Sequence, residues 1–140
     1  MYDAVLAPTD GSEGARRGVA RAIDLASEHD ARLHLLFVVG ERVHGTTPAL
    51  GSDELFLEAV TERGEAVLAE AATEAQAVCV ETVTTCVRGT PAEAIVEYAA
   101  AHDVDLVVVG CHGTGERCRP HVGSSTDRVL RETPVPVVPV

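Results

Sequence analysis

Short apolar or β-branched runs alternate along this chain with segments whose apolar residues recur every three or four positions. The runs lie at 2–9, 32–39, 78–87, 105–109 and 135–140. A strand that is almost wholly apolar, as 32–39 is, is typical of a parallel sheet that is covered on both faces. Because parallel strands are joined by crossovers that return over the sheet, the alternation predicts an α/β fold with helices on both faces of a parallel sheet.

Helical spacing marks the segments between the runs. It begins after Asp10-Gly11-Ser12, and it covers 53–76 as one long amphipathic helix. A shorter helix is expected at 125–132. The polar segment 40–52, broken by glycine and proline, is expected to be the longest loop.

A further helix is predicted to begin at Thr90-Pro91-Ala92-Glu93, which combines proline at the first helical position with a capping box. Its buried face is expected to carry Ile95, Tyr98, Ala99 and His102.

Length and charge limit what the chain can be. Its 140 residues suit one compact domain, residues 1–140. Acidic residues outnumber basic ones by 22 to 11, and the net charge of −11 argues against duplex nucleic acid or an anionic membrane as a partner. No apolar run approaches the roughly 20 residues of a membrane span, and no signal segment is visible. We therefore expect a cytoplasmic protein.

All 11 basic residues are arginines. An acidic chain without lysine resembles the proteins of salt-loving organisms, in which molar salt shortens the Debye length to about 3 Å and screens self-repulsion. This interpretation points to a halophilic archaeon. A GC-rich genome that favours arginine codons is the alternative explanation.

The chain has four cysteines, Cys79, Cys86, Cys111 and Cys118. In a cytoplasmic protein we expect all four to be reduced thiols. Cys79 and Cys86 fall in one expected strand at odd separation, so they are predicted to be small apolar fillers on opposite faces. Cys111, His112, Cys118 and His121 could meet at a zinc ion. Their spacing matches no common structural zinc pattern, so we expect no metal site there.

A glycine-rich stretch follows the run at 105–109. Its pattern is Gly110-x2-Gly113-x9-Gly123-Ser124, and Ser124 with Asp127 forms a capping-box signal for the next helix. Glycines let a backbone approach a ligand, and the free N–H groups at a helix N-terminus attract anions. Glycines that only make turns are the alternative, but the spacing and the capped helix favour a phosphate cradle. A Walker P-loop is excluded because it needs a lysine, and the dinucleotide fingerprint is missing after the first strand.

Together with Asp105–Val109 before it and Arg128–Val137 after it, this pattern resembles the universal stress protein family, in particular the subgroup that binds ATP. The resemblance extends over almost the whole chain. It implies a Rossmann-like open sheet of five strands in the order 3-2-1-4-5, and a homodimer in which the last strand, Val135 to Val140, pairs across the two-fold axis. In that order Asp10 and Gly110 converge on the topological switch point, where open α/β sheets bind ligands.

The resemblance also implies where a nucleoside would lie. Asp10, at the end of Pro8-Thr9-Asp10, is expected to accept hydrogen bonds from both ribose hydroxyls, although its position fits a helix cap equally well. Adenine is expected to lie against the ends of the second and third strands, where the residues alone would be ordinary core. The residues expected there are Val38, Val39, Val87 and Arg88.

Phosphates are expected to bind the backbone N–H groups and hydroxyls of the glycine stretch, with Mg²⁺ bound through the phosphates. The candidates in this stretch are Gly110, His112, Gly113, Gly123, Ser124 and Ser125. Arg117 and Arg119 are candidates for contacts to the outer phosphates, and exposure to solvent is the alternative. Here the chain departs from the family, because its loop is polar and contains Pro120.

Two functions are consistent with this site. The first is a regulator of a stress response that binds ATP with Mg²⁺ and has no catalytic residue. The second is a slow ATP hydrolase or phosphotransfer enzyme in which His112 or Glu116 positions water. The motif does not separate ATP from ADP or AMP, because Asp10 and the valines would contact only the nucleoside.

Overall fold

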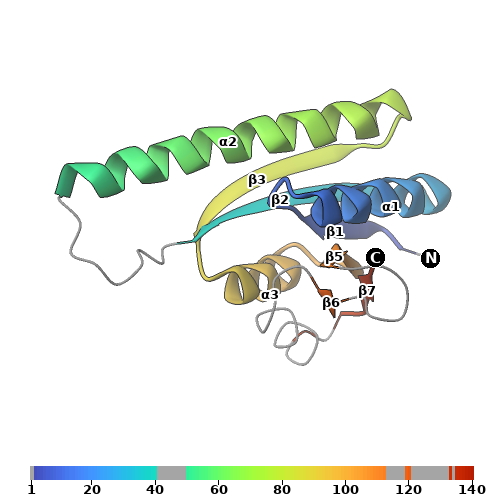
Figure 1. The fold of residues 1–140 in the computed structure, drawn as a ribbon. Coiled ribbons are helices and arrows are strands. Elements are labelled where there is room, and N and C mark those ends of the chain that lie inside the picture. Colours follow the sequence, from blue (N-terminus) through green and yellow to red (C-terminus); the bar gives the residue numbers. More distant parts are fainter. Residues whose placement is uncertain (1, 41–49, 113–118, 121–132, 134) are drawn as a thin grey trace.

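The computed structural model describes residues 2–40, 50–112, 119–120, 133 and 135–140, with residues 50–56, 111–112 and 119–120 described by their backbone alone. Five strands form one parallel sheet in the order β3-β2-β1-β4-β7 (Figure 1). This confirms the predicted order 3-2-1-4-5. The strands are β1 (Ala4–Pro8), β2 (Arg32–Gly40), β3 (Thr82–Gly89), β4 (Leu106–Val109) and β7 (Val137–Pro139).

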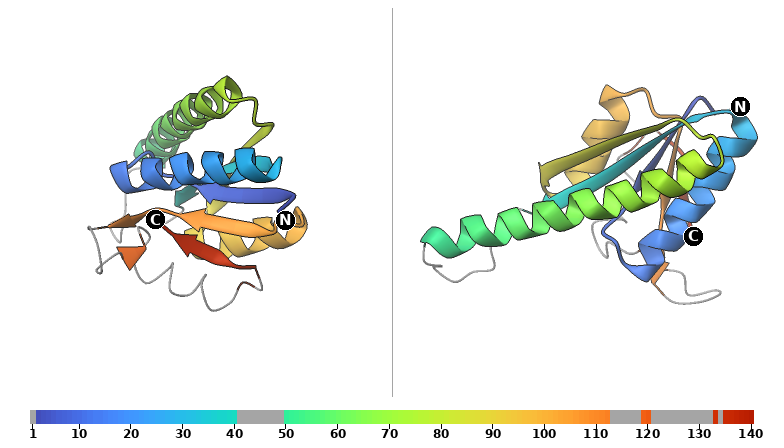
Figure 2. Two further views of the ribbon diagram at one scale, coloured as in Figure 1. Left: turned by 90° about the vertical axis from the view of Figure 1, so that its right-hand side faces the viewer. Right: turned by 90° about the horizontal axis from the view of Figure 1, so that it is seen from above.

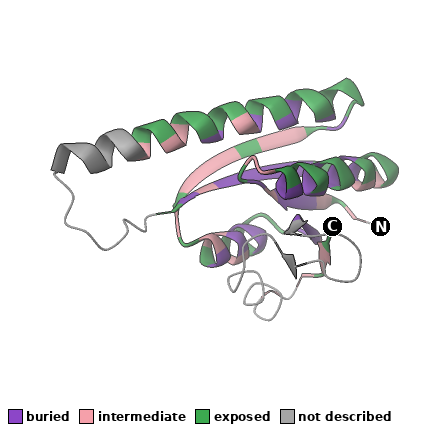
Figure 3. Cartoon of the chain, in the orientation of Figure 1, coloured by how far each residue is buried: buried purple, intermediate pink, exposed green. Residues whose placement is uncertain are grey.

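Helices cover both faces of the sheet, as predicted. α1 (Glu13–His29) and α2 (Leu50–Ala77) pack on one face, and α3 (Pro91–Ala101) packs on the other (Figures 1 and 2). The buried residues of these helices lie on the sides that face the sheet (Figure 3). In the part of the chain that the structure describes, no helix is both long enough and apolar enough to cross a membrane.

The central strands belong to two separate cores because successive side chains of a strand point to opposite faces. In β2, Leu35, Phe37 and Val39 pack against α1 and α2, whereas Leu36 and Val38 pack on the side of α3. Val5, Leu6 and Ala7 of β1 have no exposed surface. Burial on both faces explains why these strands are apolar throughout.

The third strand begins later than its apolar pattern predicts, at Thr82 instead of Val78. The N–H of Val80 donates to the carbonyl of Ala75, and Cys79 adopts a left-handed conformation with φ of 62°. These features form the C-terminal cap of α2, which uses the first residues of the run. The prediction for Cys79 was therefore wrong, since its thiol is exposed in a turn; Cys86 is half-buried in β3.

Two details of α3 also differ from the prediction. Thr90 is the N-cap residue and Pro91 follows it, but the Thr90 side chain makes no capping hydrogen bond. His102 is an exposed C-cap residue instead of part of the buried face; its N–H donates to the carbonyl of Tyr98 at 3.0 Å. Ile95, Tyr98 and Ala99 are buried as predicted.

After β4 the chain forms a feature that the sequence did not indicate. β5 (Cys111–His112) pairs antiparallel with β6 (Arg119–Pro120), so the backbone of Arg119 lies opposite that of His112. The helix predicted at 125–132 lies outside the described residues.

Candidate functional site

β1 is followed by a turn that is stabilised by hydrogen bonds to the side chains of Thr9 and Asp10. The N–H of Thr9 donates to the carbonyl of Leu36 at 2.8 Å, which extends the pairing of β1 with β2 by one residue. The Thr9 hydroxyl oxygen accepts from the N–H of Gly11 at 3.2 Å, and a carboxylate oxygen of Asp10 accepts from the N–H of Ser12 at 2.9 Å. Gly11 has φ of 82°, a conformation that glycine adopts without strain.

Ser12, not Asp10, caps the following helix. The Ser12 hydroxyl accepts from the N–H of Ala15 at 3.2 Å, and Ser12 is the N-cap residue of α1. Asp10 is exposed at the end of the strand. The alternative interpretation of Asp10 as the helix cap is therefore wrong. Its carboxylate instead stabilises the turn through the hydrogen bond from the N–H of Ser12.

The N-terminal part of α1 lies in backbone contact with the end of β4. A Cβ atom on Gly110 would overlap the carbonyl of Gly14 and would lie 2.7 Å from the N atom of Ala15. A Cβ atom on Gly18 would lie 2.9 Å from the N atom of Gly110. Gly110 thus allows helix and strand to approach closely, which places the first turn of α1 beside the ends of β1 and β4.

A hollow of about 560 Å³ opens at these strand ends. It has mostly apolar walls from the ends of β1, β2 and β4, together with the first turns of α1 and α3. Its place is the switch point of the sheet, where open α/β folds bind ligands. The residues that line this hollow, called the crevice below, are Pro8, Thr9, Asp10, Ala15, Leu36, Val38, Pro91, Ile95, Val109 and Gly110.

Comparison with known proteins agrees with this fold. The model of the universal stress protein family matches residues 1–140. The chain belongs to the universal stress protein family. A universal stress protein of Methanocaldococcus jannaschii is 34% identical over 140 residues, which is 100% of this chain and 82% of that protein.

Solved structures of other universal stress proteins share the fold. UspA from Lactobacillus plantarum superposes with a TM-score of 0.86 at 27% identity, covering 99% of this chain and 97% of that one. A universal stress protein in complex with cAMP superposes with a TM-score of 0.73 at 26% identity, covering 99% and 97% of the two chains.

Within this universal stress protein, the fold brings five of the predicted site residues together. Pro8, Thr9, Asp10, Val38 and Gly110 all line the crevice, although Asp10 and Gly110 are a hundred positions apart in the sequence. Parallel pairing of β1 with both β2 and β4 causes this convergence.

Three other predicted residues do not line the crevice. Val39 has 1% exposure in the core under α1 and α2, on the opposite face of the sheet from Val38. Val87 is half-buried against the core under α3, and Arg88 is exposed at the end of β3. The other candidates lie outside the described residues or are described only by their backbone, as His112 and Arg119 are. Those outside are Gly113, Arg117, Gly123, Ser124 and Ser125.

Sequence reasoning missed five residues of the crevice, Ala15, Leu36, Pro91, Ile95 and Val109. Two signals could have found some of them. Leu36 is two positions before Val38, so both side chains share one face of the strand. Pro91 and Ile95 lie one helical turn apart at the start of a helix that follows a strand end, which is where helix N-termini meet the crevice of this fold.

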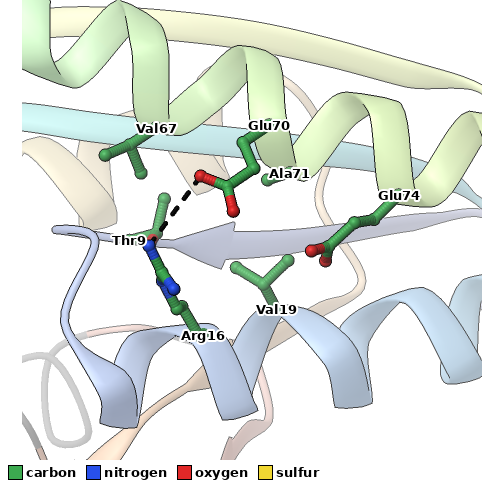
Figure 4. A pocket seen from close by; sticks show the side chains of 7 residues that line it. All are labelled: Thr9, Arg16, Val19, Val67, Glu70, Ala71 and Glu74. Carbon is green, nitrogen blue, oxygen red and sulfur yellow. Dashed lines mark ion pairs between the residues drawn. The ribbon is translucent and has the colours of Figure 1, made fainter.

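A second, smaller hollow of about 310 Å³ lies on the other side of Thr9, between α1 and α2 (Figure 4). Arg16 and Glu70 point toward one another across it, with 3.8 Å between guanidinium and carboxylate. Both ionic side chains are mostly exposed, so this pair is worth about 1 kcal/mol or less. We interpret this hollow as a gap between packed helices.

Among the described residues, no group of three histidine, cysteine or acidic side chains is placed to hold a metal ion. The side chains of the candidate zinc cluster around Cys111 and His121 lie outside that part of the chain.

Proposed function

We propose that this universal stress protein binds an adenine nucleotide in the crevice and acts as a nucleotide-dependent regulator in a stress response. ATP with Mg²⁺ is the proposed ligand. The observation that carries the proposal is the combination of an apolar hollow at the switch point with an exposed carboxylate, that of Asp10, at its rim. The relative in complex with cAMP supports an adenine nucleotide as the class of ligand.

Each part of the nucleotide has a chemical counterpart at the crevice. The flat adenine ring would lie between aliphatic side chains, for which Leu36, Val38 and Ile95 are placed. The ribose hydroxyls would donate to Asp10. The phosphates would extend past Gly110 toward the glycine stretch and the N-terminus of α1, where the helix dipole favours negative charge. Mg²⁺ would bind to the phosphates and offset part of the repulsion from a chain of net charge −11.

The proposal predicts that Asp10→Ala weakens binding of ATP·Mg²⁺ about 10- to 100-fold, because hydrogen bonds to a charged acceptor are worth about 1.5–3 kcal/mol. Asp24→Ala is the control, since it removes an equal charge from an exposed position of α1 away from the crevice. Calorimetric titration in molar KCl measures both. Equal affinity in the two variants would remove Asp10 from the site, and no binding by the wild type would reject the proposal.

We also propose a homodimer through the edge of β7. The carbonyl of Pro136 accepts from the N–H of Val107, and the N–H of Val140 donates to the carbonyl of Val109. The backbone N–H and C=O groups of the even-numbered residues therefore point toward β4. Pro139 therefore faces the outer edge, and Val137 is the described residue of β7 that presents an N–H there. This edge can form few backbone hydrogen bonds, so apolar side chains would supply most of the contact.

The dimer predicts a mass in solution of twice 14.7 kDa at micromolar concentration. Light scattering in molar KCl measures it, and a monomeric mass would contradict the dimer. High salt is chosen because the acidic, lysine-free composition supports the cytoplasm of a halophilic archaeon as the working environment.

A further inference from the structure

A buried polar group lies at the amino ends of the strands, at the opposite end of the sheet from the crevice. His34 of β2 is 6% exposed, and its Nδ1 lies 2.8 Å from the Tyr98 hydroxyl of α3. That hydroxyl also lies 3.3 Å from the hydroxyl of Thr85 in β3. The Tyr98 ring stacks on the ring of His102 with centroids 3.8 Å apart and planes 17° apart. The buried imidazole is thus connected to α3 by its hydrogen bond with Tyr98, the ring of which stacks on that of His102.

The direction of these hydrogen bonds depends on the charge of His34. When the imidazole is neutral with a bare Nδ1, Tyr98 donates to it and Thr85 can donate to Tyr98. When the imidazole is protonated, Nδ1–H donates to Tyr98, and the Tyr98 hydroxyl must turn toward Thr85. For this tautomer, protonation reverses the direction of both hydrogen bonds, and for either tautomer it places a positive charge in a buried site.

The surroundings of His34 do not compensate that charge. Burial lowers the pKa of His34, and the nearby His102 and Arg32 lower it further. The Arg32 guanidinium is itself paired with Glu81 at 3.0 Å. Within the described part of the chain, the one hydrogen bond of His34 is to Tyr98, so no carboxylate there binds the imidazole. The charged and titratable groups that line the open hollow beside His34 are Asp3, Asp30, Arg32, Glu81, His102 and Asp103.

α3 connects this group to the crevice. Pro91 and Ile95, in its first half, line the crevice, and Tyr98, in its second half, binds His34. Ile95 and Tyr98 belong to the same buried cluster and are one turn apart on one face of an 11-residue helix. A helix this short and this closely packed moves as a unit, so a displacement at Tyr98 is transmitted to the wall of the crevice.

We propose that the His34–Tyr98 pair links nucleotide binding to pH through α3. Protonation of His34 in acid displaces this helix, and the displacement lowers the affinity of the crevice for nucleotide. This inference rests on the proposed function, because it requires a nucleotide in the crevice. It assigns a regulatory role to a histidine that does not line the crevice.

The direction of the pH dependence follows from the linkage between nucleotide binding and the protonation of His34. The arrangement of α3 described above suits neutral His34, so a nucleotide that binds this arrangement must lower the pKa of His34 further. Affinity is then highest above the ordinary histidine pKa of about 6.5 and falls as the pH decreases through the pKa of His34 in the free protein. Each unit by which the ligand lowers that pKa is worth at most a tenfold loss of affinity, so we expect a loss of about 3- to 10-fold.

The experiment titrates the full-length protein with cAMP at about pH 8 and about pH 5.5, conditions that span the range in which histidine changes charge. cAMP is the probe because its phosphodiester does not titrate in this range, unlike the terminal phosphate of ATP. We expect the wild type to lose affinity at the lower pH and His34→Leu to bind equally at both. His29→Gln is the matched control, since His29 is a half-buried imidazole at the end of α1, stacked edge-on against Tyr2. It should behave as the wild type does.

The outcomes separate the two proposals. Equal affinity of the wild type at both pH values, or the same loss in His34→Leu as in the wild type, would overturn the inference; the second result would indicate another group, such as His112. If neither cAMP nor ATP·Mg²⁺ binds at either pH, both the proposed function and the inference are overturned; binding of ATP·Mg²⁺ without cAMP leaves the proposed function standing, and the comparison is then made with ATP·Mg²⁺ in the wild type and His34→Leu. If His34→Leu does not fold, Tyr98→Phe removes the hydroxyl that His34 binds, and a pH dependence equal to that of the wild type would then overturn the inference. NMR titration of the wild type tests it without any variant, since the pKa of His34 must fall when cAMP binds.

Discussion

We expect Gly110→Ala to lower the free energy of unfolding by about 3 kcal/mol or more, near the upper end of what overpacking costs. The added Cβ atom would overlap main-chain atoms of Gly14 and lie 2.7 Å from the N atom of Ala15. Overlap with a flexible side chain can be relieved by a change of rotamer, but overlap with main chain cannot. The N-terminus of α1 would have to move away from β4.

Gly40→Ala is the matched control for this prediction. A Cβ atom on Gly40 would meet nothing within 4 Å among the described residues, and the backbone of Gly40 is not in the left-handed region. We expect this substitution to change stability by less than about 1 kcal/mol, toward greater stability, because alanine loses less backbone entropy than glycine on folding. Urea denaturation at fixed KCl concentration measures both variants. Equal midpoints would show that the contact between α1 and β4 is looser than described.

This contact changes the interpretation of Gly110 that the sequence suggested. Gly110 was predicted to let the backbone approach a phosphate, and Gly110 does lie at the end of the sheet where the crevice opens. Among the described residues, the atoms that a Cβ atom on Gly110 would meet first are nevertheless those of the Gly14 carbonyl. A spacing of glycines shows that a close approach is needed, but it does not show which partner approaches.

The sequence was most informative where a single periodicity determined the structure. The runs at 2–9, 32–39 and 105–109 became the buried strands β1, β2 and β4, because a strand covered on both faces needs apolar residues at every position. The pattern was least informative at 78–87, where the C-terminal cap of α2 competed with the strand for the same residues. Both structures are locally reasonable for Val78 to Glu81, and tertiary packing decides between them.

The residues that line the crevice show a second limit of what the sequence can predict. Ile95 could be predicted as buried from its helical spacing, but the spacing does not say what it is buried against. That depends on the right-handed crossover that brings α3 across the sheet to β1 and β4. Val38 and Val39 were predicted as a pair because they end the same strand. The alternation of side chains along a strand separates them, and Val39 belongs to the core under α1 and α2.

The separation of these two valines leads to the prediction with the largest expected effect on binding. Val38→Trp should weaken binding of ATP·Mg²⁺ more than about 100-fold, because the indole would occupy the hollow of about 560 Å³ in which adenine is proposed to lie. Stability should change by less than about 1 kcal/mol, since the ring fills an open apolar space without displacing packed atoms. The chain has no tryptophan, so the introduced indole is also a specific fluorescence probe. Its emission should be that of a ring shielded from water.

Val39→Ala is the complementary substitution at the neighbouring position. Val39 is 1% exposed in the core under α1 and α2, so its truncation should lower the free energy of unfolding by about 1–3 kcal/mol. At temperatures where the variant is folded, its affinity for nucleotide should equal that of the wild type. If the two substitutions instead reduced affinity in proportion to lost stability, binding would depend on the integrity of the fold as a whole. A loss of affinity confined to Val38→Trp requires the ligand to lie on the α3 side of the sheet, where the crevice is.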